Sequence, residues 1–196
     1  MKVESKEQIL NAAVKLIQEG REPADITVRD IAAEANVQLG LINYHFGTKD
    51  ELMYQAVGVL KYKIASNIIT KEEEDKNVAA NAAYQKFRKM LIELCEMSIK
   101  YSQYMRFTVE YELTKAEIVT PHYLIPLIRE IYTASSGGGK VSETGIRIKA
   151  YEIISILQLI FLRAKDMSNY FGFNVLNYDR MVEVIDTILN DHFPEH

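Results

Sequence analysis

Apolar residues recur along this chain at intervals of three and four, which is the spacing of one face of an α-helix. The first such segment predicts a helix over residues 5–19. We expect Ser5 and Gln8 to form a capping box at its start and Gly20 to end it. The apolar positions of this helix are Ile9, Ala12, Ala13, Leu16 and Ile17.

A second and a third helix are predicted directly after a polar loop. Thr27 is a favoured N-cap residue, and Asp30 follows it at the spacing of a capping box. Asn36 tolerates the left-handed backbone conformation and is expected to end the second helix. The third helix is predicted over residues 38–46, and Thr48 then caps a fourth.

Two apolar pairs are expected to fix the second and third helices to a core. Ile26 precedes the Thr27 cap and is placed to pack on Ile31 in the first turn of the second helix. Ile42 and Phe46 lie four residues apart and are expected to pack beneath the third helix. Helix, tight turn and exposed short helix together form the geometry with which many proteins enter the major groove of DNA.

The rest of the chain predicts a helical body. Further helices are expected over residues 49–70, 78–100, 101–117, 122–134, 142–167 and 178–192. The charged run 71–76, the break at Pro121, the glycine-rich stretch 135–140 and residues 168–177 are expected as loops. The helix over 142–167 is apolar over so wide an arc that it should pack on more than one side. The sequence thus predicts an all-α fold of about nine helices.

Length and composition fit a globular cytoplasmic protein. The chain has 196 residues, 48% of them hydrophobic, and no apolar run reaches the roughly 18 residues that span a bilayer. The first residues, MKVESKEQ, lack the apolar segment of a signal peptide. Cys95 is the single cysteine, which excludes an internal disulfide and indicates a reducing compartment.

The charge balance is unfavourable for general binding to nucleic acid. The net charge is −4, and residues 1–50 hold six Lys and Arg against eight Asp and Glu. Phosphate binding commonly rests on Lys and Arg. Any DNA binding by this chain must therefore rest on a few placed groups.

No catalytic or metal-binding constellation stands out. Of the four histidines only His45 lies in a recognisable motif, and that motif is not enzymatic. Cys95 lies on an apolar helical stripe, which is typical of a small core residue rather than a nucleophile. We expect no enzyme, no cofactor and no metal site, although a metal site built from scattered residues stays open.

The segment ITVRDIAAEANVQLGLINYHFGTKDEL resembles the N-terminal helix-turn-helix signature of TetR-family transcriptional regulators. The likeness lies in the Thr-capped second helix, in Gly40, in the triplet Tyr44-His45-Phe46 and in Lys49 before an acidic-leucine step. The resemblance implies a cytoplasmic homodimer that binds a palindromic operator in double-stranded DNA, usually as a repressor, and that a small molecule releases. It implies a three-helix DNA-binding head over residues 1–48 and a ligand-binding and dimerisation body over residues 49–196.

Carried over position by position, the resemblance implies a DNA-binding surface. The residues assigned to the phosphate backbone are Thr27, Tyr44, His45 and Lys49. The residues at or near base edges are Arg29, Gln38, Leu39 and Asn43, and Gly40 belongs to the same DNA-binding surface. The chemistry agrees, because Arg pairs with guanine, Asn and Gln pair with adenine, and Leu contacts the thymine methyl group. Gln38 and Asn43 depart from the serine and tyrosine that are frequent at these positions.

Each assignment has a structural alternative. Tyr44 is also compatible with a core aromatic residue and His45 with an ordinary surface histidine. Arg29 has an alternative as the ion-pair partner of Asp30 or Glu34.

Two rival functions stay open at this point. The first is an interaction protein that keeps the fold of the head but binds a protein partner through Leu39 and Leu41. The second is a helical enzyme that uses Cys95 and a histidine.

Methionine and aromatic side chains suggest where the body would bind an effector. They suit a drug-sized apolar or aromatic molecule, although such stripes are also typical of a plain core. The candidates are Met90, Leu94, Met97, Tyr101, Met105, Tyr111, Tyr123 and Phe161. The last two predicted helices are expected to pair with their symmetry mates in a homodimer, unless the longer one is the central core helix of the body.

Overall fold

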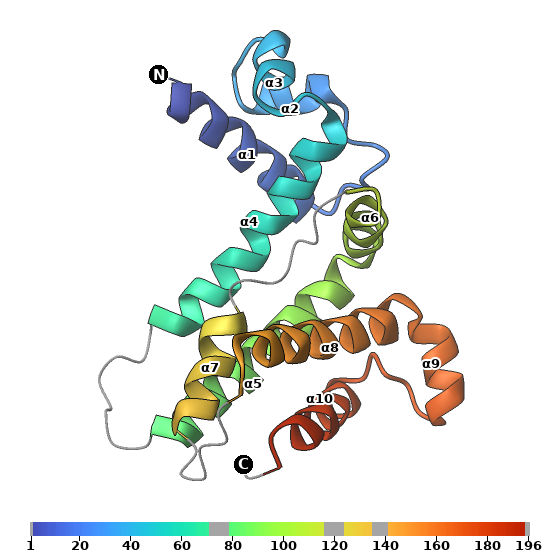
Figure 1. Cartoon of the computed structure of the whole chain (residues 1–196). Coiled ribbons are helices and arrows are strands. Elements are labelled where there is room, and N and C mark those ends of the chain that lie inside the picture. The colour runs from blue at the N-terminus through green and yellow to red at the C-terminus, as the bar shows by residue number, and fades with distance from the viewer. Residues whose placement is uncertain (1, 71–78, 116–123, 135–140, 195–196) are drawn as a thin grey trace. The chain divides into compact units, whose positions relative to one another are not determined.

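The computed structural model describes residues 2–70, 79–115, 124–134 and 141–194, and these residues form ten α-helices and no strand (Figure 1). The all-α prediction is therefore confirmed. The helices are α1 (Lys2–Gln18), α2 (Val28–Glu34), α3 (Leu39–Phe46), α4 (Lys49–Thr70), α5 (Ala79–Lys100), α6 (Ser102–Glu112), α7 (Leu124–Ala134), α8 (Glu143–Leu162), α9 (Ala164–Phe171) and α10 (Tyr178–His192). No described helix is both long and apolar enough to cross a membrane.

The chain forms two compact units. Unit 1 comprises Met1–Lys63 and Gln103–Ala116, and unit 2 comprises Ile64–Ser102 and Glu117–His196. Unit 1 thus contains the predicted head together with the first part of α4 and nearly all of α6. The predicted boundary between residues 48 and 49 lies at the start of α4, inside unit 1.

The core of unit 1 forms because α1, α2, α3 and α4 each turn an apolar face inward. Helix α1 packs against α2 and α3, and α2 packs against α3. Ile26 and Ile31 are both fully buried, as expected for a staple at the start of α2. The other buried apolar residues of these helices include Ile9, Ala13, Ile17, Ala32, Ile42, Phe46, Leu52, Met53, Ala56 and Val57.

The predicted start of the first helix is wrong. Helix α1 already begins at Lys2, so Ser5 lies inside the helix and cannot be its N-cap. The Ser5 hydroxyl instead forms a 2.8 Å hydrogen bond with Nε2 of His45 in α3. A Ser followed by a Gln three residues later is a capping signal only where the helix starts, and here a tertiary contact uses the serine.

Unit 2 is built around α5. Helix α7 packs against α5 and α8, and α10 packs against α5 and α8. Buried side chains of α5 include Phe87, Met90 and Leu91. At the end of α10, Phe193 lies edge-on to Phe87, with ring centres 6.0 Å apart. Arg88 donates two hydrogen bonds, of 2.6 and 2.9 Å, to the carboxylate of Asp186, which ties α5 to α10.

The long helix predicted over residues 142–167 is in fact two helices. Helix α8 ends at Leu162, and α9 begins at Ala164, inside the region expected as part of one helix and a loop. Arg163 between them has φ −111° and ψ 31°, which is not helical, and its side chain pairs with Asp166 at 3.2 Å. No glycine or proline marks this break in the sequence.

Several sequence-based expectations lie outside the described residues. They are the loops over 71–76 and 135–140, the break at Pro121 and the candidate ligand residue Tyr123. Among the described residues no group of three or more His, Cys, Asp or Glu side chains could hold a metal ion.

Candidate nucleic-acid interface

Helix α2, which precedes the turn to α3, is held at both of its ends by local hydrogen bonds. At the start of α2, Thr27 Oγ1 accepts a 3.1 Å bond from the Asp30 amide, and the Asp30 carboxylate accepts a 2.8 Å bond from the Thr27 amide. At its end, Asn36 has φ 51°. The amides of Asn36 and Val37 donate to the carbonyls of Ala33 and Ala32, which is the Schellman arrangement with Asn36 in the left-handed position. The expected capping box and left-handed asparagine are confirmed.

Helix α3 hides one face and exposes the opposite one. Ile42 and Phe46, four residues apart, are buried in unit 1. Leu39 and Leu41 remain 43% and 37% exposed, and Tyr44 is 66% exposed. Tyr44 is therefore a surface residue, and the alternative that it is a core aromatic residue is excluded.

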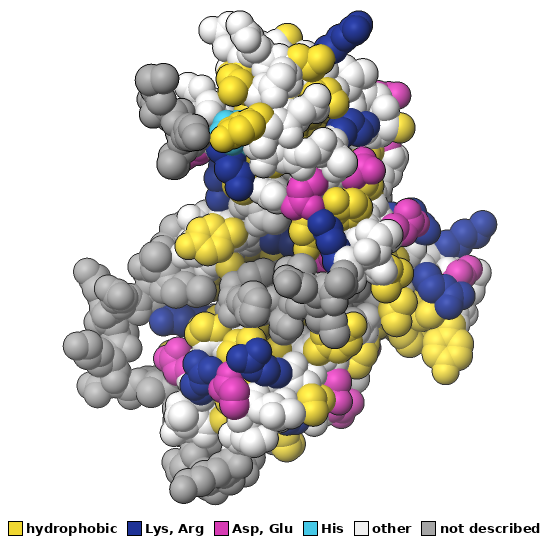
Figure 2. Space-filling model, turned by 45° about the horizontal axis from the view of Figure 1, so that its top comes forward, with side chains coloured by type: hydrophobic (Ala, Val, Ile, Leu, Met, Phe, Trp, Pro, Cys, Tyr) yellow, Lys and Arg dark blue, Asp and Glu magenta, His cyan; other side chains and the backbone are white. Residues whose placement is uncertain are grey.

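The exposed part of α3 carries no Lys or Arg. Its exposed polar groups are those of Asn43, the hydroxyl of Tyr44 and the amide of Gln38, which is the N-cap residue but makes no side-chain capping bond. On the face shown in Figure 2, basic side chains are interspersed with acidic and apolar ones. The surface of α3 can therefore offer hydrogen bonds and apolar contacts, but little charge.

Gly40 lies on this exposed face and is not required by the packing of the protein. A Cβ atom built on Gly40 would meet no atom within 4 Å, and the same holds for Gly58 in α4. Glycine lowers helix stability relative to alanine. The packing of unit 1 therefore gives no reason for a glycine at position 40.

Arg29 is exposed on α2, and the two carboxylates considered as its partners are engaged elsewhere. Arg21 pairs with Asp30 at 3.1 Å, and Lys15 pairs with Glu34 at 2.5 Å. Among the interactions described for these residues, none involves Arg29. Among the described residues Arg29 forms no ion pair with Asp30 or Glu34, so the ion-pair alternative for Arg29 is not what the structure contains.

His45 is held between α1 and α3. It is half-buried, its Nε2 is bonded to Ser5, and the Tyr44 ring lies edge-on to it at 5.2 Å between ring centres. His45 therefore orients the start of α1 against α3 and places Tyr44 beside it.

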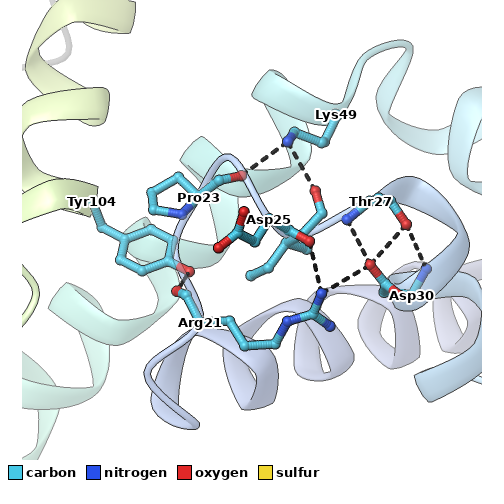
Figure 3. Close-up of polar contacts among 8 residues, drawn as sticks. Arg21, Pro23, Asp25, Thr27, Asp30, Lys49 and Tyr104 are labelled. Carbon is cyan, nitrogen blue, oxygen red and sulfur yellow. Dashed lines mark hydrogen bonds and ion pairs between the residues drawn. The ribbon is translucent and has the colours of Figure 1, made fainter.

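Lys49, the first residue of α4, is used inside unit 1. Its ammonium donates a 2.9 Å hydrogen bond to the carbonyl of Pro23 and a 2.8 Å bond to that of Ile26 (Figure 3). These bonds join the start of α4 to the loop before α2. An ammonium has three N–H donors, so one remains for a further partner.

The same loop is held from two other directions. The Arg21 guanidinium donates to the Asp25 carbonyl at 2.7 Å and to the Asp30 carboxylate at 3.1 Å. From α6, the buried Tyr104 donates its hydroxyl to the Arg21 carbonyl, as Figure 3 shows. The Thr27 amide and hydroxyl, with Arg21, hold the pKa of the Asp30 carboxyl below its usual value. Sequence reasoning missed Arg21 and Tyr104, because nothing local indicates their contact.

Polar contacts join α4 to the C-terminal end of α6. Tyr111 donates a 3.1 Å hydrogen bond to Glu51, and Lys115 forms an ion pair with the same carboxylate. Tyr54 donates a 3.1 Å bond to Glu112, and burial raises the pKa of the Tyr54 phenol. Tyr111, a candidate ligand residue, is thus engaged within unit 1.

The remaining candidate ligand residues lie in both units. In unit 2, Met90, Leu94 and Phe161 belong to the buried core, and Met97 is also buried. Tyr101 is half-buried, with the Lys100 ammonium 5.2 Å from its ring centre. Met105 lies buried in unit 1. The described members of this set are thus divided between the two units, and its role in ligand binding stays a prediction.

One side of α8 carries exposed apolar residues. Ile146, Ala150, Ile153 and Leu157 face the core, whereas Ile148, Tyr151, Ile156 and Leu159 are 52%, 52%, 41% and 58% exposed. Leu176 and Tyr178, at the start of α10, are also exposed. The second apolar side expected for this helix is therefore present, without a described partner.

Cys95 is buried in the core of unit 2, and burial raises the pKa of its thiol to about 12. A thiol of this kind is almost entirely protonated near neutral pH.

Comparison with known proteins gives a match for the head. Residues 9–56 match the family described as bacterial regulatory proteins, tetR family. An HTH-type transcriptional repressor of Mycobacterium tuberculosis and an HTH-type transcriptional regulator of Mycobacterium bovis are each 53% identical to this chain over 45 residues. The match covers 23% of this chain and 23% of each relative, about a quarter of their length.

Solved structures give a likeness over almost the whole chain. A TetR-like transcriptional regulator from a Rhodococcus species superposes with a TM-score of 0.52 at 16% identity, covering 94% of this chain and 92% of that one. A member of the TetR family from Streptomyces coelicolor gives 0.50 at 18%, covering 94% and 97%. At these identities the likeness concerns the fold. The helix-turn-helix segment of this chain thus matches the tetR family of bacterial regulatory proteins, and the chain shares the fold of TetR-like regulators over almost its whole length.

Proposed function

We propose that this protein regulates transcription by inserting α3 into the major groove of an operator. The observation that carries the proposal is the outward face of α3, which follows a helix α2 capped by Thr27 and a turn formed at Asn36. Its exposed apolar and polar side chains are of the kinds that contact base edges in the major groove. A relative of the head supports regulation, since it is named a transcriptional repressor.

The surface divides into base-reading and backbone-binding groups. Asn43 and Gln38 hydrogen-bond to adenine, Arg29 reaches a guanine, and Leu39 contacts a thymine methyl group. The phosphate backbone takes the Tyr44 hydroxyl. The recognition surface is completed by Thr27, Gly40, His45 and Lys49, of which His45 and Lys49 act chiefly by holding α1, α3 and the loop before α2 in place.

The protein acts as a homodimer on a palindromic operator. The exposed apolar side of α8, with the start of α10, pairs with its symmetry mate and buries residues such as Ile156 and Leu159. The two α3 helices of the dimer then enter successive major grooves, whose centres are roughly 34–36 Å apart.

A small apolar or aromatic molecule releases the dimer from DNA. It binds the helical body and prefers a conformation in which the separation of the two α3 helices no longer fits the operator. A ligand shifts such an equilibrium only by its difference in affinity for the two states. Repression is the simplest outcome of such binding.

One alternative rests on charge. The head is net negative, and two leucines of α3 are exposed, so a protein partner could take the place of DNA on this surface. Selection of bound duplexes from a random pool at low salt separates the two functions. The DNA-binding proposal predicts a palindromic site, and recovery of no bound sequence would refute it.

Gly40 provides a matched pair of variants for the same test. Ala in place of Gly40 or of Gly58 meets no atom of the protein, so each should raise stability by up to about 1 kcal/mol. Gly40→Ala should nevertheless weaken operator binding, because its methyl group separates α3 from the groove, whereas Gly58→Ala should leave binding unchanged. Equal affinity of both variants would contradict the placement of α3 in the groove.

A further inference from the structure

The chemistry of α3 is unusual for a surface that meets a polyanion. Leu39 and Leu41 flank Gly40, and both leucines retain over a third of their exposure. The helix contains no Lys or Arg, and the ring of its one histidine is tied to Ser5. Apolar contact is therefore the largest interaction that this helix can add once it lies against another molecule.

The helical period places these groups in three adjacent rows. Residues four apart share one side of a helix, so Leu39 lies beside Asn43, Gly40 beside Tyr44 and Leu41 beside His45. The row of Gly40 and Tyr44 lies between the two leucines. Without a Cβ at Gly40, the backbone of the first turn can approach a partner closely, and both leucines then reach it.

We propose that Leu39 and Leu41 recognise the 5-methyl groups of thymines, and that Asn43 reads an adenine next to the thymine of Leu39. The inference rests on the proposed DNA-binding function and names what the surface selects. The thymine methyl is the only apolar group that an A·T or G·C pair presents in the major groove. The part of each half-site that α3 reads then contains thymines, beside the guanine proposed for Arg29 of α2.

The extent of the apolar surface favours this occupant over a protein partner. A stable protein interface buries about 800 Å² on each side, with an apolar centre. Two partly exposed leucines separated by a glycine offer far less. A methyl group on a base edge matches the size of one leucine terminus.

Replacement of thymine by deoxyuridine tests the proposal, because it removes the methyl group and leaves base pairing unchanged. The operator is first selected from a random pool with the full-length protein. Each thymine of the half-site is then replaced in turn, and affinity is measured at one salt concentration. We expect about fourfold weaker binding for each contacted methyl, the effect of burying one methylene-sized group.

Variants assign each methyl to a side chain. In Leu39→Ala, deoxyuridine at one position of the half-site should no longer weaken binding. In Leu41→Ala, the same should hold for a different position. Leu113→Ala is the matched control, since Leu113 is an 82% exposed leucine of unit 1 outside α3, and it should keep the full pattern. All three residues are exposed enough for the variants to fold.

The outcomes separate this inference from the proposed function. If the wild-type protein binds its operator equally well with deoxyuridine at every position, methyl recognition is refuted while DNA binding stands. Methyl recognition by these leucines is equally refuted if Leu39→Ala and Leu41→Ala keep the wild-type pattern. If no duplex is bound at all, the proposed function fails first and the inference fails with it.

Discussion

The ammonium of Lys49 donates a 2.8 Å hydrogen bond to the carbonyl of Ile26, the residue directly before the cap of α2. A second bond joins Lys49 to Pro23. Lys49, which is expected to contact the phosphate backbone of DNA, therefore also holds the loop before α2 in place. Its effect on DNA binding should include a structural part.

Replacement of Lys49 should destabilise unit 1 as well as weaken DNA binding. In Lys49→Met two carbonyls lose a charged donor, and we expect a loss of about 2 kcal/mol in the free energy of unfolding. Operator and non-operator duplexes should be affected alike, because no base contact is removed. Chemical denaturation and gel shifts measure the two effects. Lys89→Met, at an exposed position of α5, is the control, and equal stability of both variants would contradict the structural part.

Tyr104 should control the mobility of the loop before α2. In Tyr104→Phe the Arg21 carbonyl loses its donor from α6, so amide hydrogen exchange should accelerate over residues 21–26. The matched control is Tyr132→Phe, which removes a hydroxyl bonded to the His192 carbonyl within unit 2. Exchange-detected mass spectrometry should show acceleration near Arg21 in the first variant alone. Unchanged exchange there would mean that Arg21 and Lys49 suffice to hold the loop.

Asp30 should make the stability of the head depend on pH in the acidic range. Its pKa is lowered in the folded protein, so its stabilising effect is complete above the ordinary aspartate pKa and is lost as the pH falls through the lowered value. Wild type should therefore be more stable than Asp30→Asn at pH 7, and the two should converge in acid. Denaturant unfolding between pH 7 and pH 3 measures this difference. A difference that stays constant over the whole range would contradict it.

Two neighbouring residues of α3 should affect DNA recognition differently. Asn43→Ala should change the preference at one base pair, by about 1–3 kcal/mol, because a base-edge contact is lost. Tyr44→Phe removes only a hydroxyl and should weaken binding to all sequences by a similar factor. Competition binding with every single-base change in the operator measures both patterns. Uniform loss in Asn43→Ala would show that Asn43 does not read a base.

Cys95 should be unreactive in the folded protein. Its thiol is buried and its pKa is raised to about 12, so very little thiolate is present at pH 7. Iodoacetamide should label it only after denaturation, as mass spectrometry would reveal. Rapid labelling of the native protein would restore the rival that uses Cys95 as a nucleophile.

The features predicted best from the sequence are helix caps and turns, which depend on hydrogen bonds between residues close together in the chain. Thr27 and Asn36 act on amides and carbonyls within five residues, and the structure has both the cap and the left-handed turn that they indicate. Gly20, with φ 80°, ends the first helical segment as expected. The bounds predicted for the last helix, Tyr178–His192, are confirmed.

Side chains with distant partners could not be assigned in this way. Ser5 bonds to His45, and Tyr104 reaches Arg21, across 40 and 83 residues of sequence. Such contacts depend on the packing of whole helices, which the local pattern does not contain. The break between α8 and α9 could not be predicted from the sequence either. The backbone leaves the helical conformation at Arg163, where no glycine or proline marks the change.

Helix α6 packs with the head in unit 1 although it lies far from it in sequence, and this affects how chimeric regulators must be built. A fusion that joins residues 1–48 of this chain to a foreign body would leave behind Tyr104, and with it the donor to the Arg21 carbonyl. It would also leave behind both sides of the contacts that Glu51 and Tyr54 of α4 form with Tyr111 and Glu112 of α6. The DNA-binding unit that can be transferred therefore consists of two segments of the chain. A chimera must include residues 103–115 together with the head, or the surface of the head that α6 covers must be redesigned.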